Sequence, residues 1–431
     1  MKKMVEVKGL RYHKNADKVT GTKLTFPNNV TQSGLCSTCI KCGECEIGKK
    51  AKTGQTLFPQ PFGAAQFGAE KRTPNLEDLQ ILPELYGEEV VFRKVKTETT
   101  IGKFKVKAPL AIAAMGSTIV AHSLGKELAE GAARAGILMS IGENVIATYG
   151  KEGLKNRIQP FLDNYNGYGA VIVQGNGHDI KMGAYELAKE YGAHAIEVKF
   201  GQGAKQGLGG EIKVQTKEEA EKYRQYGYHI EENPDGTFQR HSMPGALTPE
   251  KLKENMLKYA ELDMPIFTKT GNGKGIIRLI KALDELKKEN GVPIQSLTID
   301  GFGGGTGMSP WLIMNEMNID SASVFNALDE KPSFDILLAG GHNTGFDVAK
   351  GMMLGSKGSA MGRPFLIAAN ADKEQGVENF VSALIEELQM ITATLHLTSV
   401  DELVDRKQNL IALNNEASTM FGVPQNPKAL L

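Results

Sequence analysis

The chain has 431 residues, with 50 basic and 50 acidic side chains, a balance that argues against nucleic acid or an anionic membrane as the main partner. Its length exceeds that of a simple domain and suits a barrel of alternating strands and helices, which takes about 250 residues, with attached segments. No apolar run reaches the length of a membrane span, and the N-terminal sequence MKKMVEVKGLRYHKN lacks the apolar core of a signal peptide. A soluble, cytoplasmic protein is therefore expected.

The four cysteines of the chain all lie within the segment CSTCIKCGECEIGKK. Such close packing suits one inorganic centre in a reducing compartment better than a disulfide framework. Thiolates select iron-sulfur clusters or zinc, and successive CxxC steps favour an iron-sulfur cluster. We expect a 4Fe-4S cluster on Cys36, Cys39, Cys42 and Cys45. A 3Fe-4S cluster on three of them, a zinc ion, and free thiols are the alternatives.

Residues 1–105 are interpreted as an N-terminal arm that carries this cysteine segment. From residue 106 onward, short apolar runs alternate with helical patterns, which is typical of parallel strands joined by crossover helices. Eight runs are predicted to be strands: 109–115, 136–141, 170–174, 195–200, 265–270, 296–301, 335–341 and 358–362. They predict an α/β fold, a closed (β/α)8 TIM barrel over 106–373.

Three further predictions complete the architecture. Helices are expected at 119–135, 275–289 and 346–354. A polar insertion at about 213–244 is interpreted as a lid, and residues 374–431 as a helical C-terminal tail on the outside of the barrel.

Functional side chains of such barrels lie where strands end and loops begin. The fourth strand leads into IEVKFGQGAKQGLGGE, where small residues let the backbone approach a ligand and Lys205 favours an anion. After the seventh and eighth strands, glycines and Arg363 supply the parts of a phosphate site. The candidate cofactor-binding residues are Met115, Gly116, Ser117, Gln174, Lys269, Gly304, Gly305, Thr306, Gly340, Gly341, Gly362 and Arg363.

The catalytic candidates are Lys269, Glu143 and Lys205. Lys269, inside the apolar run PIFTKT, is expected to point into the barrel mouth, where it would stabilise negative charge near the N1-C2 carbonyl of a reduced flavin. The alternative is a structural lysine paired with Glu197 or Asp300. Glu143 would bind a substrate amine or move a proton, or would only stabilise the start of a helix.

Over roughly residues 107–395 these features resemble the FMN-binding central domain of glutamate synthase. The resemblance rests on QGAKQGLGGE (202–211), similar to the family's QGAKPGEGGQ, on FTKTGNG and DGFGGGTG, and on AGGHNTGFDVAKGMMLG through MGRPF. It implies FMN across the barrel mouth, with Met115, Gly116, Gln174 and Lys269 lining the isoalloxazine. It also implies that the phosphate lies at Gly340, Gly341, Gly362 and Arg363, and that Lys205 and Glu143 hold 2-oxoglutarate or 2-iminoglutarate.

The chain departs from the family pattern in three ways. Glu211 replaces a family glutamine, so the substrate contact is altered. No amidotransferase domain is recognisable, so ammonia or an amine would come from solution or a separate amidotransferase subunit. The cluster cysteines precede the barrel instead of following it, so electrons would enter from another direction.

The expected function is that of an FMN- and iron-sulfur-dependent oxidoreductase of the glutamate synthase type, acting on CH-NH2 donors in glutamate biosynthesis. A ferredoxin or an NAD(P)H-oxidising reductase subunit would supply electrons through the cluster and FMN to a 2-oxo or 2-imino acid such as 2-iminoglutarate. A homo-oligomer is compatible with this interpretation. The alternatives are an enzyme like the methylamine-glutamate N-methyltransferase subunit, or a non-catalytic metal-bearing subunit of a larger complex. A 2-hydroxy acid oxidase also carries GRPF, but its His-Gly-Gly-Arg segment is absent from DGFGGGTG.

Overall fold

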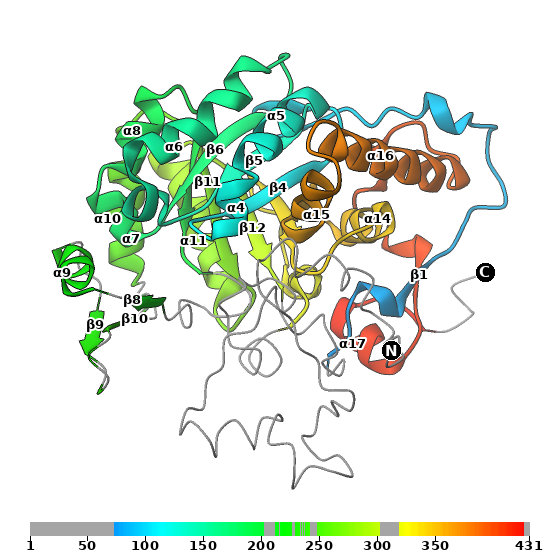
Figure 1. Ribbon diagram of the computed structural model, residues 1–431. Helices are drawn as coiled ribbons and strands as arrows, with labels where there is room; N and C mark the ends of the chain where they lie inside the picture. The colour runs from blue at the N-terminus through cyan, green and yellow to red at the C-terminus, as the bar shows by residue number, and fades with distance from the viewer. Residues whose placement is uncertain are drawn as a thin grey trace, which may run out of the picture.

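The computed structural model describes residues 73–201, 212–214, 216–225, 229–232, 234, 236, 238–241, 248–301 and 319–425 (Figure 1). Its centre is a closed barrel of eight parallel strands in the order β11-β12-β13-β14-β4-β5-β6-β7. The strands are β4 (Leu110–Met115), β5 (Leu138–Ile141), β6 (Ala170–Gly175), β7 (Ala195–Lys199), β11 (Ile266–Gly271), β12 (Ile294–Asp300), β13 (Asp335–Ala339) and β14 (Gly358–Met361). Each overlaps one of the eight predicted runs, so the predicted TIM barrel is confirmed.

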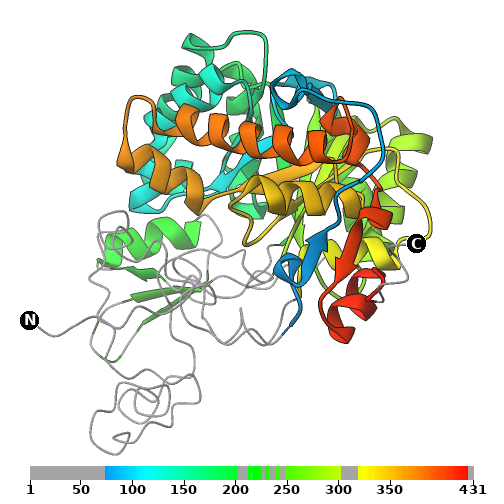
Figure 2. The same ribbon diagram turned by 90° about the vertical axis from the view of Figure 1, so that its right-hand side faces the viewer.

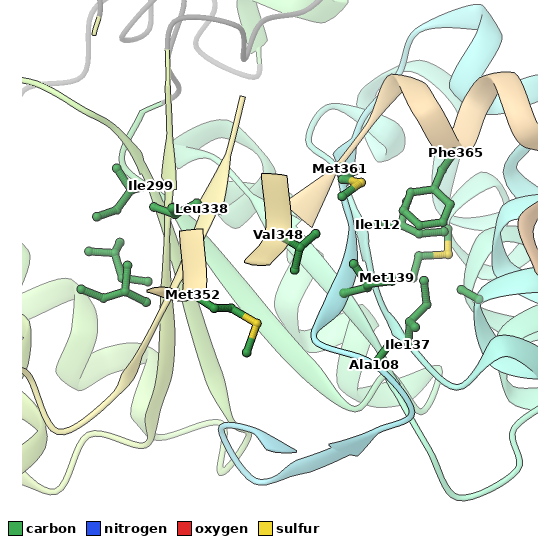
Figure 3. Close-up of a cluster of buried hydrophobic side chains, with 14 of the residues drawn as sticks. Ala108, Ile112, Ile137, Met139, Ile299, Leu338, Val348, Met352, Met361 and Phe365 are labelled. Carbon is green, nitrogen blue, oxygen red and sulfur yellow. The ribbon is translucent and has the colours of Figure 1, made fainter. Parts of the chain in front are cut away.

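The strands are apolar because both of their faces are covered. One face packs against the surrounding helices: Ile112, Met139 and Leu338 meet Val348, Met352 and Phe365 in this layer (Figure 3). The other face fills the barrel interior. Its buried members include Ala111, Leu138, Ala170, Ile172, Ala195, Phe267, Leu337, Ala339 and Ala360.

Helices surround the barrel (Figure 1). Those of the barrel itself are α4 (Ile119–Ser123), α5 (Gly125–Ala135), α6 (Val145–Asp163), α7 (Gly177–Lys181), α8 (Ala184–Glu190), α10 (Pro249–Ala260), α11 (Ile276–Asn290), α13 (Val324–Ala327), α14 (Gly345–Leu354) and α15 (Arg363–Ala371). The prediction of one helix over 119–135 was wrong in detail. The helix is interrupted at Leu124 (φ −111°, ψ 11°), where the Ser123 hydroxyl donates a hydrogen bond to the Val120 carbonyl. A serine that bonds to a nearby backbone carbonyl competes with helix continuation.

The insertion in the fourth unit forms a small sheet with one helix. Strands β8 (Ile212–Val214), β10 (Phe238–His241) and β9 (His229–Glu232) pair antiparallel in that order, and α9 is Lys217–Gln225. Tyr223 and Phe238 pack with Ala147 of α6 and with Met182. The insertion is thus attached near the loops that follow β5 and β6, and its role as a lid remains a prediction.

The segments before and after the barrel pack against it. Helix α16 (Gly376–Thr394) lies along the outside, against α5, α14 and α15 (Figure 2). Strand β1 (Leu79–Ile81) pairs antiparallel with β15 (Leu410–Ala412), and α17 (Asn415–Phe421) follows. The tail is therefore mostly helical, as predicted, with one strand in addition. Short 3-10 turns complete these segments: η2 (Leu76–Asp78), η3 (Phe92–Lys94), η4 (Ser321–Ser323), η5 (Val400–Leu403) and η6 (Lys407–Asn409).

A hairpin plugs the amino end of the barrel. Strands β2 (Thr99–Ile101) and β3 (Phe104–Val106) bury Ile101 and Val106 with the interior side chains, and Phe104 stacks on Phe267 at 6.0 Å between ring centroids. Because this end is closed, a ligand of the barrel must bind at the carboxyl ends of the strands. Within the described ranges, no helix has the length and apolar content needed to cross a membrane.

Candidate active site

The barrel interior becomes polar toward the carboxyl ends of its strands. A small internal cavity is lined by apolar residues, among them Ile172 and Phe267, and by four polar ones: Ser140, Glu197, Lys269 and Thr298. These side chains come from β5, β7, β11 and β12, and all are buried. Buried charges are retained only where they are paired or serve a ligand, so this layer is the candidate active site.

Lys269 lies in this layer as the cation of a buried ion pair. Its ammonium is 3.4 Å from an Asp300 carboxylate oxygen on the neighbouring strand β12, and both side chains are more than nine-tenths buried. Burial alone lowers the lysine pKa, but the nearby carboxylates, first that of Asp300 and then that of Glu197, outweigh it, so the pKa of Lys269 is raised. Lys269 therefore stays protonated. The pairing with Asp300 is the one that the alternative of a structural lysine predicts, and a role toward a flavin remains a prediction.

Glu197 on β7 holds two polar side chains, one from β5 and one from the neighbouring strand β6. The Ser140 hydroxyl donates to one carboxylate oxygen at 2.7 Å, and the Gln174 amide nitrogen donates to the other at 2.6 Å. The amide of Gln174 is thereby oriented, with its nitrogen toward Glu197 and its oxygen left for another donor. From the sequence, Glu197 is expected only as a partner for Lys269. Glu197 lies two residues before Lys199 on β7, so both side chains are on the interior face of the strand. This spacing is the sequence feature that could have identified Glu197 as a site residue.

Glu143 pairs with a lysine that had not been assigned a role. The Lys199 ammonium donates to the Glu143 carboxylate at 2.5 Å, and both side chains are largely buried. Lys199 ends β7 and is the register partner of Lys269 on β11. Glu143 is therefore not a simple helix-start carboxylate: it faces a cation on a strand two positions around the barrel.

Asp179 links the two loops beside this pair. Its carboxylate accepts hydrogen bonds from the backbone N-H groups of Asn144 at 2.9 Å and Asn176 at 3.1 Å. Asn144, directly after Glu143, has a left-handed conformation (φ 65°), which asparagine tolerates better than most residues. Burial raises the pKa of Asp179 to about 7, and the charge of Glu143 adds to the effect.

The ends of β4 and β5 approach each other through glycines. A Cβ atom on Gly116 would lie 2.2 Å from the Glu143 carbonyl oxygen, and one on Gly142 would lie 2.4 Å from the Gly116 nitrogen. The Gly142 N-H donates to the Met115 carbonyl at 3.0 Å. Met115 and Gly116, both predicted to line the ring of a flavin, are thus fixed next to Glu143.

The predicted phosphate site differs between its two loops. After β13, Gly340 and Gly341 have positive φ values of 103° and 93°, and the start of α14 is already capped by Thr344 and Asp347. After β14, α15 starts at Arg363 with Gly362 at its N-cap position and no side-chain cap. An uncapped helix start with a glycine cap and an arginine is a good fit for a phosphate. The residues present therefore fit the FMN phosphate, with α15 the better donor.

Several predicted residues lie outside the described residues: Cys36, Cys39, Cys42, Cys45, Lys205, Gly304, Gly305 and Thr306. Ser117 is described and follows Gly116 in the loop between β4 and α4. Within the described part of the chain, no group of His, Cys, Asp or Glu side chains could hold a metal ion. The cluster prediction is therefore untested.

Comparisons with known proteins identify the family and the fold. A sequence model of the conserved region in glutamate synthase matches residues 66–375. The archaeal glutamate synthase [NADPH] of Archaeoglobus fulgidus is 26% identical over 315 residues, which are 69% of this chain and 52% of that protein. The one from Methanocaldococcus jannaschii is 22% identical, over 82% of this chain and 72% of that protein. The chain thus spans about half the length of the first relative.

Solved structures show the same fold. A flavocytochrome b2 variant with sulfite bound superposes with a TM-score of 0.56 at 20% identity, over 81% of this chain and 80% of that one. A lactate oxidase of Pediococcus acidilactici gives a TM-score of 0.52 at 17% identity, over 76% and 82%. Because the family model covers well over half of the residues, the chain belongs to the glutamate synthase family, as its sequence motifs indicated.

Proposed function

We propose that this barrel is an FMN-dependent oxidoreductase whose flavin binds across the carboxyl ends of the strands. Met115, Gly116, Ser117, Gln174 and Lys269 would contact the ring. The phosphate would lie at the start of α15, between Gly362 with Arg363 and the glycine pair Gly340 and Gly341. Bound FMN would supply hydride transfer to or from an organic substrate.

The observation that carries the proposal is the buried ammonium of Lys269. Keeping a lysine charged inside a barrel is costly, and here two carboxylates, those of Asp300 and Glu197, contribute to holding it protonated. A fixed cation at this depth can stabilise negative charge on a ring stacked above it without reorganising during the reaction. The oriented amide of Gln174 offers its oxygen to a ring N-H in the same layer.

The substrate is proposed to be a small 2-oxo or 2-imino acid, such as 2-iminoglutarate. The Lys199 and Glu143 pair supports this, because it combines a cation for a carboxylate with a carboxylate that can hold an amine or move a proton. Lys205 would add a second cation from its loop. Glu211, in place of the family's glutamine, would alter the fit and select the acid.

The electron path is proposed to run through the four cysteines. Residues 1–105 would form an arm that carries a 4Fe-4S cluster on Cys36, Cys39, Cys42 and Cys45. Residues 106–373 would form the flavin barrel, and 374–431 the outer tail. A ferredoxin or a reductase subunit would deliver electrons, and an amidotransferase subunit or free ammonia would provide nitrogen. A cytoplasmic location suits reduced thiolates of this kind.

Anaerobic purification followed by cofactor analysis tests the proposal. We expect close to one FMN per chain, bound iron and sulfide, and bleaching of the flavin bands by dithionite. Reoxidation by 2-oxoglutarate with ammonia, compared with other oxo acids and with glutamate plus methylamine, identifies the substrate class. A protein that contains neither FMN nor iron after anaerobic handling contradicts the proposal, and a colourless protein with bound zinc favours a structural subunit.

A further inference from the structure

Three consecutive carbonyl groups at the end of β4 are held from outside the barrel by side chains of α6. One Arg157 nitrogen, Nη1, donates to the carbonyls of Met115 at 3.0 Å and Gly116 at 2.9 Å. The Tyr149 hydroxyl donates to the carbonyl of Ser117 at 3.0 Å. The Tyr149 ring is itself fixed, because it stacks on His122 with 3.6 Å between centroids and 6° between planes.

This arrangement fixes the direction of three N-H groups. In a trans peptide the carbonyl of one residue and the N-H of the next point in opposite directions, and the described chain has no cis peptide. With the carbonyls of residues 115–117 turned toward α6, the N-H groups of Gly116, Ser117 and Thr118 point away from that helix. Among the described residues, these three N-H groups have no acceptor. Successive N-H groups that face one way form a concave site for negative charge.

Arg157 also brings a charge that the described residues do not neutralise. Its side chain is buried, and Nε and Nη2 have no hydrogen-bond partner within the described ranges. No ion pair to a carboxylate is formed there either. Burial lowers the pKa of Arg157 to about 10, so the guanidinium remains charged at neutral pH. Gly125 of α5 leaves room for it, since a Cβ there would lie 3.3 Å from the arginine Cγ and Nε.

The cost of burying this cation is not repaid by a salt bridge, so its contribution lies in what it orients. We propose that Arg157 is a positioning residue that fixes residues 115–118 so that their N-H groups stabilise the anionic reduced flavin. The positive charge of Arg157 would add to this stabilisation. Tyr149 completes the clamp at Ser117. The proposal rests on the proposed function, because it names the flavin as the group that these donors face. Arg157 would add a second source of positive potential to that of Lys269 on β11.

The test compares Arg157→Met, Arg157→Lys and Tyr149→Phe with a control, Lys155→Met, which removes an exposed cation from the same helix. The measurements are FMN content and the flavin midpoint potential. Arg157→Met is expected to lose at least tenfold in its preference for reduced over oxidised FMN, about 30 mV for a two-electron couple. Arg157→Lys should keep most of the potential, because it keeps the charge, and Tyr149→Phe should give a smaller shift in the same direction. Lys155→Met should match the wild type.

Two outcomes overturn the clamp. One is a folded Arg157→Met protein with full FMN and an unchanged potential. The other, which needs no flavin, is a crystal structure of flavin-free Arg157→Met in which the carbonyls of 115–117 keep their directions. If Arg157→Met does not fold, Tyr149→Phe decides the matter: full FMN with an unchanged potential in that variant also contradicts the clamp. If the wild type binds no FMN, the proposed function fails, and the flavin-free structures still decide whether Arg157 sets the peptide directions.

Discussion

At the scale of single residues, the site depends on charges that only their neighbours make tolerable. Lys269 and Asp300 are both inside the barrel and 3.4 Å apart, with the Glu197 carboxylate adding to the field at the lysine. Such a group contributes little net stability as a pair, but removing one member leaves a buried charge without compensation. The pair is better understood as a device that holds a cation in position than as a stabilising contact.

Lys269→Met is therefore expected to lower the free energy of unfolding by about 3 to 5 kcal/mol, because Asp300 is left ionised and buried. The double variant Lys269→Met with Asp300→Asn should recover most of this loss, since it removes the unpaired charge. In both variants we expect a lower flavin potential or weaker FMN binding, because the cation is gone. Urea unfolding and flavin titration measure the two effects. Unchanged FMN affinity and potential in the double variant would exclude Lys269 from the flavin site.

The raised pKa of Asp179 makes the free energy of unfolding depend on pH. Its pKa is about 7 in the folded protein against 3.8 as the ordinary value, so between these values the folded state binds more protons than the unfolded state. Its contribution to stability is therefore full below about pH 4 and is lost as the pH rises through 7. The free energy of unfolding of the wild type, taken relative to that of Asp179→Asn, should fall as the pH rises from about 4 to 7, because asparagine does not titrate. Urea unfolding at several pH values measures it, and a difference that stays constant with pH would contradict the shifted pKa.

At the scale of elements, the helices after β13 and β14 differ in how their first turns are capped. Helix α14 uses Thr344 and Asp347 to satisfy its own first turn, whereas α15 begins after Gly362 without a side-chain cap. A phosphate can complete the start of α15 in the way a capping side chain completes α14. This difference was invisible in the motifs, which show two similar glycine corners.

Arg363→Ala is expected to weaken FMN binding by about 10 to 100-fold, the loss of one charge-assisted hydrogen bond to phosphate. Lys373→Ala is the matched control, because it removes an exposed cation just beyond the end of the same helix. Titration of flavin-free protein with FMN, followed by fluorescence quenching, gives both constants. Wild-type affinity in Arg363→Ala would show that the phosphate is held elsewhere.

At the scale of the whole molecule, the barrel could be predicted because its strands are apolar on both faces, a pattern that survives without knowledge of contacts. Candidate residues at strand ends were predictable for the same reason. The partnership of Gln174 with Glu197 was not, because it depends on the register between β6 and β7. Arg157 could not be predicted either, since a helix residue 41 positions beyond Gly116 in the chain reaches it only after the barrel closes.

The proposed electron path runs through the cysteine segment, and this link can be tested separately from the flavin. Replacing Cys36, Cys39, Cys42 and Cys45 together by serine should remove the iron, because a thiolate cluster has no other ligands in a chain with four cysteines. FMN content should stay at the wild-type level, since the proposed flavin contacts lie in the barrel. Dithionite should still bleach the flavin, whereas reduced ferredoxin or the reductase partner should no longer do so.

Single variants then distinguish the kinds of centre. If the wild type and Cys45→Ser contain iron with the same three-iron spectroscopic signature, only three of the thiolates hold the cluster. If the wild type contains zinc and the quadruple variant still accepts electrons from the partner, the proposed path through the cysteines is wrong. Iron analysis, electron paramagnetic resonance and stopped-flow reduction of the flavin separate these outcomes. Because dithionite reaches the flavin directly, a defect confined to the protein donor assigns the loss to the cysteine segment and leaves the barrel site intact.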